Sequence, residues 1–417
     1  MAQLTDDCFV PGAPVLRVEE AAALIAQRLP VTAGIETVPL GLADGRVAAA
    51  DIHALHAVPP FANSAVDGYA VRHADLAPEG PTRLPVTGRL PAGAQAGEGA
   101  VWPGAVRIFT GAALPPGADT VFMQEDVTLD GDRVSLPPGL IRGANARAGG
   151  EDAGEGALVI PQGRRLRPQD LALAAASGHD RLPVRRRLRV AVFSTGDELT
   201  EPGRPLAPGA IHDSNRVMIA ALLARLGAEV ADLGILRDAP AALAARLSEA
   251  AAGHDLVLTS GGVSVGEEDH VRGAVEAVGR LAFWRLAIKP GRPVAMGIVA
   301  GTPFVGLPGN PVAAYVTLAF VVGPLLARLG GALYTAPEGQ PVRAVFGLRK
   351  RPGRREFLRA SLRTGLDGLP ELHRFPRDGS ALLSSLTESD GLAEIPDEAT
   401  RIEPGAILRF HPYGLLW

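Results

Sequence analysis

A glycine-rich loop at residues 259–266 is the part of this chain whose residue types most directly suggest chemistry. The short apolar run 256–258 before it predicts a buried strand, and residues 267–278 after it predict a helix. A strand that ends in such a loop and opens a helix presents free backbone N–H groups and the positive end of a helix dipole, which suit an anion such as phosphate. The loop residues expected to bind the ligand are Ser260, Gly261, Gly262 and Ser264.

Three carboxylates, Glu267, Glu268 and Asp269, stand where that anion should bind. They would repel a phosphate unless a divalent cation lies between them, and hard cations such as Mg²⁺ prefer carboxylate and phosphate oxygens. The stretch therefore predicts a phosphorylated ligand bridged to a metal. The alternative is that the acidic residues only favour the first turn of a helix, by roughly 0.3–1 kcal/mol each.

Three cations follow in the stretch 283–292. If residues 284–289 are extended, Arg285 and Lys289 point to the same face, and the Pro-Gly turn brings Arg292 near them. Cations and carboxylates that converge on one sheet edge suit a site for anions plus a metal. A structural salt-bridge network is the alternative.

Strands and helices alternate from Leu188 onward, which predicts a doubly wound parallel sheet with helices on both faces. In such sheets, ligands bind beyond the carboxyl ends of the strands. Polar loops follow four expected strands, at residues 194–198, which include Glu198, and at 237–238, 259–269 and 307–311. In the last loop, capping by Asn310 and Pro311 explains the residues equally well without a ligand.

The N-terminal half carries polar blocks of its own. Residues 63–71 read Asn-Ser-Ala-Val-Asp-Gly-Tyr-Ala-Val, in which Asp67 is either functional or part of an ordinary turn into a strand. Thr110, at the end of an expected strand, is a candidate oxyanion contact or a plain turn residue. Asp152 belongs to an acidic pair, Glu151-Asp152, that glycines flank, and Arg147 lies shortly before it.

The pattern predicts a multidomain α/β plus β chain. Short alternating runs with regular turns indicate a small, barrel-like β-domain in the first half and another β-domain at the C-terminus. The first of these is inserted into a helical or mixed domain that begins with an amphipathic helix at residues 18–29 and resumes with a helix at 168–177. The expected domains are 1–55 with 143–185 (discontinuous helical or mixed), 56–142 (inserted β), 186–330 (α/β) and 331–417 (C-terminal β).

Composition narrows the class of protein. With 417 residues, 47% apolar and 21% charged, the chain is typical of a soluble protein of two to four domains, and its net charge of −4 gives no support for nucleic-acid binding. The single cysteine, Cys8, excludes intrachain disulfides and is consistent with a reducing cytosol. No signal peptide is visible, and the longest apolar run, residues 313–327, is shorter than the roughly 20 residues that a membrane span needs, so it predicts a buried helix.

Six motifs stand in order along almost the entire chain: residues 63–71, Gly-Glu-Asp at 150–152, Thr-Gly-Asp-Glu-Leu at 195–199, the glycine-rich stretch 259–269, Ile-Lys-Pro-Gly-Arg-Pro at 288–293 and Leu-Pro-Gly-Asn-Pro-Val at 307–312. Together they resemble the molybdopterin molybdenumtransferase family, related to bacterial MoeA and the E domain of gephyrin. The resemblance implies a molybdopterin-binding α/β domain within a four-domain subunit of a homodimer, with active sites built at the dimer interface.

The same resemblance implies a reaction: adenylylated molybdopterin and molybdate give molybdenum cofactor and AMP, assisted by Mg²⁺. It also implies a cytoplasmic enzyme that works after molybdopterin adenylyltransferase, without nucleic acid or membrane. The catalytic residues that it implies are Asp67, Asp152, Glu198, Asp238 and Asp269, of which Asp238 and Asp269 would bind the metal. The binding residues that it adds are Thr110, Arg147, Lys289, Pro308, Gly309 and Pro311.

Two positions depart from the family pattern, because Arg285 and Arg292 stand where lysine is expected. The charge is kept but the donor geometry is not. Two rival functions stay open: a competence-damage-type enzyme acting on pyridine nucleotides, which shares the module at about residues 188–328, and a gephyrin-like binding scaffold. The sequence does not distinguish molybdate from tungstate as substrate.

Overall fold

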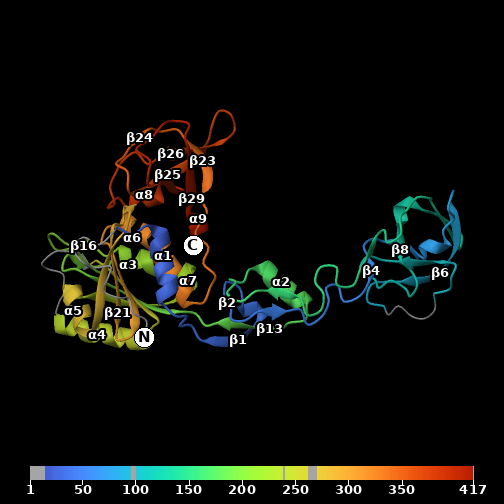
Figure 1. The fold of residues 1–417 in the computed structure, drawn as a ribbon, viewed down its shortest axis with the longest axis horizontal. Helices are drawn as coiled ribbons and strands as arrows, with labels where there is room; N and C mark the ends of the chain where they lie inside the picture. Colours follow the sequence, from blue (N-terminus) through green and yellow to red (C-terminus); the bar gives the residue numbers. More distant parts are fainter. Residues whose placement is uncertain (1–14, 95–99, 238–239, 262–269, 417) are drawn as a thin grey trace. The chain divides into compact units, whose positions relative to one another are not determined.

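The computed structural model describes residues 15–94, 100–237, 240–261 and 270–416 (Figure 1). The chain divides into two compact units. Unit 1 comprises Met1–Glu36, Gly45–Ala49 and Arg185–Trp417, and unit 2 comprises Thr37–Asp44 and Ala50–Val184.

Unit 1 is organised around a six-stranded sheet in the order β17–β14–β18–β22–β21–β19. Its strands are β14 (Arg189–Thr195), β17 (Glu229–Leu236), β18 (Leu256–Ser260), β19 (Gly279–Arg285), β21 (Pro293–Val299) and β22 (Thr302–Leu307). The first four in the order are parallel, so their C-terminal ends lie on one edge of the sheet, as predicted. The antiparallel strands β21 and β19, which the sequence pattern does not predict, complete the sheet.

Helices cover both faces of this sheet because alternate strand residues point to opposite sides. Val190 and Val192 belong to one buried cluster, and Ala191 and Phe193 belong to another. The first cluster includes residues of α1 (Val18–Arg28), α3 (Asn215–Arg225), α6 (Pro311–Thr317) and α7 (Gly323–Leu329). The second includes residues of α4 (Pro240–Gly253) and α5 (His270–Val278), which lie on the other side of the sheet in Figure 1. The doubly wound fold is therefore confirmed.

The predicted buried helix is longer than its apolar run. α6, the π-helical turn η5 (Leu318–Val322) and α7 form one helical stretch, Pro311–Leu329. By length and composition this stretch could cross a membrane, and it is the one such helix in the described part of the chain, but 89% of its apolar window is buried inside the protein. The wide turn of η5 precedes Pro324, whose nitrogen cannot donate a helical hydrogen bond.

The C-terminal part of unit 1 is a small barrel. Its sheet has the order β20–β25–β26–β23–β29–β27, and an additional pairing of β25 with β27 closes it. The strands are β20 (Ile288–Lys289), β23 (Gln340–Ala344), β25 (Arg355–Thr364), β26 (Pro370–Arg374), β27 (Gly391–Ile395) and β29 (Ile407–Pro412). Shorter elements are β15 (Leu199–Thr200) with β16 (Ile211–His212), β24 (Leu348–Arg349) with β28 (Arg401–Ile402), α8 (Ser384–Thr387) and α9 (Tyr413–Leu416).

Unit 2 contains the predicted β-domain, a six-stranded sheet in the order β8–β5–β7–β6–β10–β9. The strands are β5 (Gly68–Val71), β6 (Thr82–Leu90), β7 (Ala105–Ile108), β8 (Thr120–Met123), β9 (Thr128–Asp130) and β10 (Arg133–Leu136), with the short turns η3 (His73–Asp75) and η4 (Gln124–Asp126). Among the described residues the two end strands do not pair, so the sheet is not a closed barrel.

The segments that flank this sheet pair with each other. β3 (Ile52–His53) pairs with β12 (Leu158–Ile160), and β4 (Asn63–Ser64) pairs with β11 (Ala146–Arg147). The remaining elements are β1 (Ile35–Pro39), η2 (Leu40–Leu42), β2 (Val47–Ala48), α2 (Pro168–Ala176) and β13 (Arg181–Arg185). Helix α1, assigned by the predicted boundaries to the discontinuous domain, packs instead in the first core of unit 1 through Ala21 and Ile25. The domain boundaries themselves stay a prediction.

Candidate functional site

The glycine-rich loop begins at the edge where the parallel strands of unit 1 end. Ser260 is the last residue of β18 and Leu307 is the last residue of β22, and the two are register partners. The Gly261 N–H donates a hydrogen bond of 3.1 Å to the Leu307 carbonyl. The first residues of the glycine-rich loop and of the loop 307–311 are therefore held side by side, as the sequence predicts for two strand ends on one edge.

Gly261 has a backbone conformation that suits only glycine. Its φ is +83°, and a Cβ built there would lie 3.0 Å from the Thr195 carbonyl at the end of β14. A side chain at this position would thus be strained in conformation and crowded by backbone. The tight packing brings the strand ends of β14 and β18 to the start of the loop without an intervening side chain.

Asn215, the first residue of α3, cross-links the two loops. Its Nδ2 donates to Ser260 Oγ at 2.9 Å and to the Gly309 carbonyl at 2.7 Å. Both Asn215 and Ser260 are buried. Sequence reasoning missed Asn215, although an asparagine at the start of an apolar helix was a signal for it.

The start of α3 is fixed by a second cluster. Arg216 is buried and donates from its backbone N and Nε to Asp213, at 3.2 and 2.8 Å, and it also pairs with Glu201 and Asp232. Hydrogen bonds to Asp213 and Asp232 raise the pKa of Arg216 above its ordinary value despite the opposing effect of burial, which is the largest single influence. Asn215 is consequently presented by a rigid helix end.

Three buried polar atoms at this edge have no hydrogen-bond partner among the described residues. They are Ser194 Oγ, Thr195 Oγ1 and Asn215 Oδ1. Buried polar groups in native proteins are generally paired, so each such atom needs an explanation, such as a ligand. Glu198 follows on the same loop, where its carbonyl accepts a hydrogen bond of 2.8 Å from Ile211 and its side chain is exposed. The edge therefore fits a polar ligand.

The cationic stretch is arranged differently from the prediction. Residues 284–289 do not form one extended strand, because β19 ends at Arg285 and β20 joins the barrel through β25. Buried Leu286 lies between the two strands and pairs with Leu16, so the single extended strand from which a shared face of Arg285 and Lys289 was expected does not form. Leu286 N donates to the Arg292 carbonyl at 2.8 Å, which keeps Arg292 across the turn from Arg285.

Lys289 is exposed and reaches a buried carboxylate of the barrel. Its Nζ donates to Glu356 Oε2 at 3.1 Å. Arg285 and Arg292 are also exposed, and no carboxylate pairs with either among the described residues. Two of the three predicted cations thus keep their charge available for an anion.

Arg359 is a candidate that sequence reasoning missed. It is buried in β25, where Nε donates to Ser385 Oγ and Nη2 to the Gly379 carbonyl, each at 3.0 Å. No carboxylate lies within ion-pair distance in the described part of the chain, and burial lowers the pKa of its guanidinium below the ordinary value. The neighbouring Ser380 carbonyl accepts a hydrogen bond of 3.0 Å from Val312 at the start of α6. A buried arginine without an acidic partner is suited to an anionic ligand.

In unit 2, Asp67 is bound to Thr110. The backbone N and the hydroxyl of Thr110 each donate to Asp67 Oδ1 at 2.8 Å. These two bonds, with a smaller contribution from the charge of Arg107, lower the pKa of Asp67 below its usual value. The carboxylate is partly exposed, and both hydrogen bonds go to one of its two oxygens.

The block that carries Asp67 is enclosed by the other polar segments of unit 2. Asn63 pairs with Arg147, and the Ser64 carbonyl accepts a hydrogen bond of 2.8 Å from Gly111. Asp152 N donates to the Val58 carbonyl at 2.9 Å, just before the block begins. The structure therefore brings the segments of Thr110, Arg147 and Asp152 together around residues 58–67.

Four predicted site residues lie outside the described residues: Asp238, Gly262, Ser264 and Asp269. Among the residues that are described, no group of three or more His, Cys, Asp or Glu side chains could hold a metal ion. The expected metal ligands are among the four, so the metal site stays a prediction. Pro308, Gly309 and Pro311 lie where expected, and Pro311 opens α6 after Asn310, whose side chain makes no capping hydrogen bond.

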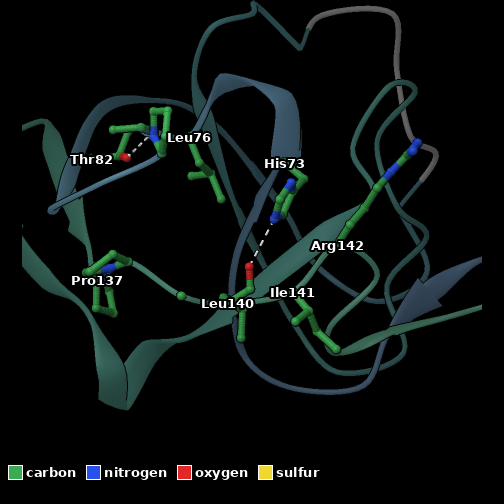
Figure 2. Close-up of a pocket in the computed structure, with 11 residues that line it drawn as sticks. His73, Leu76, Thr82, Pro137, Leu140, Ile141 and Arg142 are labelled. Atoms are coloured by element: carbon green, nitrogen blue, oxygen red, sulfur yellow. Dashed lines mark hydrogen bonds between the residues drawn. The ribbon is translucent and has the colours of Figure 1, made fainter.

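A pocket of about 380 Å³ in unit 2 is separate from all of these residues. Figure 2 shows His73 Nε2 within 3.0 Å of the Leu140 carbonyl at its wall, with Thr82, Pro137, Ile141 and Arg142 around it. No predicted site residue lines it. It plays no part in the candidate site.

Family comparisons account for the order of these segments along the chain. Residues 16–178 match the MoeA N-terminal region (domain I and II), residues 191–328 match a probable molybdopterin binding domain, and residues 341–413 match the MoeA C-terminal region (domain IV). All three parts of the family architecture are thus present in one chain.

Full-length relatives agree. The chain is 39% identical over 406 residues to the molybdopterin molybdenumtransferase of Haemophilus influenzae, with 96% of this chain and 100% of the relative covered. It is 36% identical over 408 residues to that of Nostoc sp., covering 95% and 93%. The solved structure of the molybdopterin biosynthesis MoeA protein from Pyrococcus horikoshii OT3 superposes with a TM-score of 0.81 at 30% identity, covering 96% of this chain and 100% of that one. The chain belongs to the MoeA family of molybdopterin molybdenumtransferases, enzymes of molybdenum cofactor biosynthesis.

Proposed function

We propose that the chain inserts molybdate into adenylylated molybdopterin, giving molybdenum cofactor with release of AMP. The observation that carries this proposal is the junction at the strand ends of unit 1, where Asn215 holds Ser260 and Gly309 together beside buried polar atoms that lack hydrogen-bond partners among the described residues. A junction of this kind forms a rigid, polar binding site at the sheet edge where α/β folds bind ligands. The names of the full-length relatives supply the substrate class.

The phosphate of the ligand would be seated at the start of the glycine-rich loop. Ser260 Oγ accepts a hydrogen bond from Asn215, so its own proton is free to be donated to a phosphate oxygen. Backbone N–H groups of the loop add further donors of fixed direction. Pro308 and Gly309 border the same seat, held by the hydrogen bond to Asn215.

Molybdate is a dianion and would be bound by cations next to that seat. Lys289 and Arg359 are two candidates, because Lys289 is exposed on the barrel strand β20, where it pairs with Glu356, and Arg359 is buried without a carboxylate partner among the described residues. Arg285 and Arg292 supply further positive charge across the neighbouring turn. Charge-assisted hydrogen bonds to oxyanions are about twice as strong as neutral ones, which suits capture of a small oxyanion from dilute solution.

Asp238 and Asp269 would hold Mg²⁺, which when bound would neutralise charge between the ligand's phosphate and the protein's carboxylates. Glu198 is exposed on the loop after β14 and would orient polar groups of the ligand at the same edge. Asp67 and Asp152 would act from unit 2 of a second subunit, since we propose a homodimer with composite active sites. The adenylylated substrate must come from an adenylyltransferase that acts just before this enzyme, in the cytoplasm.

The direct test is a turnover assay on the full-length chain. Incubation with adenylylated molybdopterin, molybdate and Mg²⁺ should release AMP and leave molybdenum bound to the pterin, and both products should depend on molybdate. Samples without molybdate, or with a chelator of divalent cations, are the controls. Binding of the pterin without AMP release under any of these conditions would support the scaffold role instead.

The pyridine-nucleotide alternative is not favoured. It shares only the central module, whereas residues 16–178 and 341–413 match MoeA regions outside that module. The same assay with nicotinamide mononucleotide in place of the pterin should give no product. Substituting tungstate for molybdate would establish the metal preference.

A further inference from the structure

We propose that Arg107 is a positioning residue that fixes the Asp67–Gly68 turn and so holds the Asp67 carboxylate in the orientation that its ligand requires. This inference rests on the proposed role of Asp67 in the transferase reaction. It adds a residue whose side chain touches the turn and not the ligand.

Arg107 contacts the turn both directly and through Gln124. It is the register partner of Tyr69, with β7 antiparallel to β5, and its Nη1 donates to the Gly68 carbonyl at 3.2 Å. Its Nη2 donates to the side-chain oxygen of Gln124, whose backbone N donates to the Asp67 carbonyl at 3.0 Å. Both peptide carbonyls of the turn are thus tied, directly or through Gln124, to one guanidinium.

Two aromatic rings hold that guanidinium in place. The Arg107 Cζ lies 5.2 Å from the ring centre of Tyr69 and 4.9 Å from that of Phe109. A planar guanidinium between rings and with fixed donors is pre-organised in a way that a lysine ammonium is not. No carboxylate forms an ion pair with Arg107 among the described residues.

Gly68 has no space for a side chain. A Cβ at Gly68 would lie 1.8 Å from the Phe122 carbonyl, so β8 packs directly on the backbone of the turn. With Phe122 on one side and Arg107 on the other, small changes at Arg107 are transmitted to the orientation of Asp67. The charge of Arg107 also contributes, after the two Thr110 hydrogen bonds, to the lowered pKa of Asp67.

The test compares Arg107→Met with Arg107→Lys, Arg107→Gln and a matched control, Arg89→Met. Arg89 lies 4.7 Å from the same Phe109 ring but makes no described hydrogen bond to the turn. Full-length variants are assayed for kcat and KM across pH 4–8, with circular dichroism to establish that each is folded.

Arg107→Met should lower kcat/KM by roughly tenfold or more, since a misplaced group costs rate steeply. The acid limb of its pH profile should move to higher pH, because loss of a positive charge raises the pKa of Asp67. Arg107→Lys keeps the charge, so the acid limb of its pH profile should stay at the wild-type position, while its kcat/KM should be only partly retained. Arg89→Met should match the wild-type chain in both kcat/KM and pH profile. If Arg107→Met does not fold, Arg107→Gln, which keeps a donor without the charge, should show the same shift of the limb.

Two results would overturn the inference, and they differ in meaning. If Asp67→Asn is inactive but folded variants of Arg107 keep the wild-type rate and pH profile, Arg107 does not position Asp67. If Asp67→Asn is itself fully active, the proposed role of Asp67 fails and the inference about Arg107 fails with it.

Discussion

Thr110 donates two hydrogen bonds to the same oxygen of Asp67, one from its backbone N and one from its hydroxyl, both 2.8 Å long. The two residues are 43 positions apart in the sequence, so their contact depends on the tertiary fold. Because the bonds stabilise the ionised form, they lower the pKa of Asp67.

Thr110→Val should therefore raise the pKa of Asp67 part of the way back, since the backbone bond, the largest influence, is kept. In the native protein this pKa is lower than in the unfolded chain, so ionised Asp67 stabilises the fold at neutral pH and loses that effect as the pH falls through the folded pKa. The acid limb of kcat/KM should move upward in pH in Thr110→Val and stay in place in Thr110→Ser. An unchanged limb in the valine variant would mean that the hydroxyl does not tune Asp67.

Much of the fold follows from the sequence because local signals and tertiary packing agree. The strand ends at Leu236 and Leu307 are confirmed, β14 ends at Thr195, one residue beyond the expected Ser194, and Pro168 opens α2 as expected. The strands β19 and β21 were missed because antiparallel pairing depends on partners that periodicity alone does not reveal. Residues 284–289 do not form the single strand that was expected, because the chain passes there from one sheet to another.

The candidate site was predictable where a motif is local and not where contacts are distant. Ser260, Gly261 and Gly309 meet because they follow parallel strands, which the alternation predicts. The cross-link by Asn215 and the buried Arg359 depend on pairings across 45 and 26 residues, which leave no periodic signal. The only sequence signal for Arg359 was that it is the one charged residue in the otherwise apolar run 357–360.

Asn215→Ala should lower the stability of the fold and weaken binding of the ligand's phosphate. It removes two buried hydrogen bonds, which costs about 1–3 kcal/mol of stability for the groups left unpaired. KM for the pterin should rise more than kcat falls, because the seat for the phosphate loosens while the reacting groups remain. Asn310→Ala is the matched control on the adjoining loop, since Asn310 makes no side-chain capping bond. Equal effects of the two substitutions on KM would argue against a specific role for Asn215.

Lys289→Ala should weaken anion binding by roughly 10- to 100-fold, the scale expected when a hydrogen bond to a charged group is lost. Calorimetry with molybdate alone and with the pterin ligand alone separates the two candidate anions. Glu356→Gln should instead strengthen anion binding, because it removes the negative charge 3.1 Å from Lys289 and leaves the lysine free to bind the anion. Unaltered affinities for both anions in Lys289→Ala would remove this residue from the site.

Arg359→Met tests whether the buried arginine binds the oxyanion. A ligand at about 100 times its Kd stabilises the folded state by about 2.7 kcal/mol, so molybdate should raise the unfolding temperature of the wild-type chain. Arg359→Met should keep its fold and lose most of that rise. Arg363→Met, an exposed position on the same strand, should retain it. A full molybdate shift in Arg359→Met would show that the arginine is structural.

Asp67 and Asp269 provide the test of the composite active site. Asp67 lies in unit 2, and Asp269 closes the glycine-rich loop in the sequence of unit 1, outside the described residues. Each single substitution to Asn should lower turnover by roughly 10²-fold, the scale for removing one well-placed electrostatic group. An isologous two-fold dimer would form two identical sites, each taking Asp67 from one chain and Asp269 from the other.

Mixing the two inactive variants, Asp67→Asn and Asp269→Asn, under conditions of subunit exchange should then restore activity. In a mixed dimer, one of the two sites carries both substitutions and the other carries neither, so each heterodimer should have half the activity of a wild-type dimer. Tagging the two variants differently allows the heterodimer to be purified and its turnover measured directly. A purified heterodimer that stays inactive would place both carboxylates in a site within one chain, and would rule out the composite arrangement.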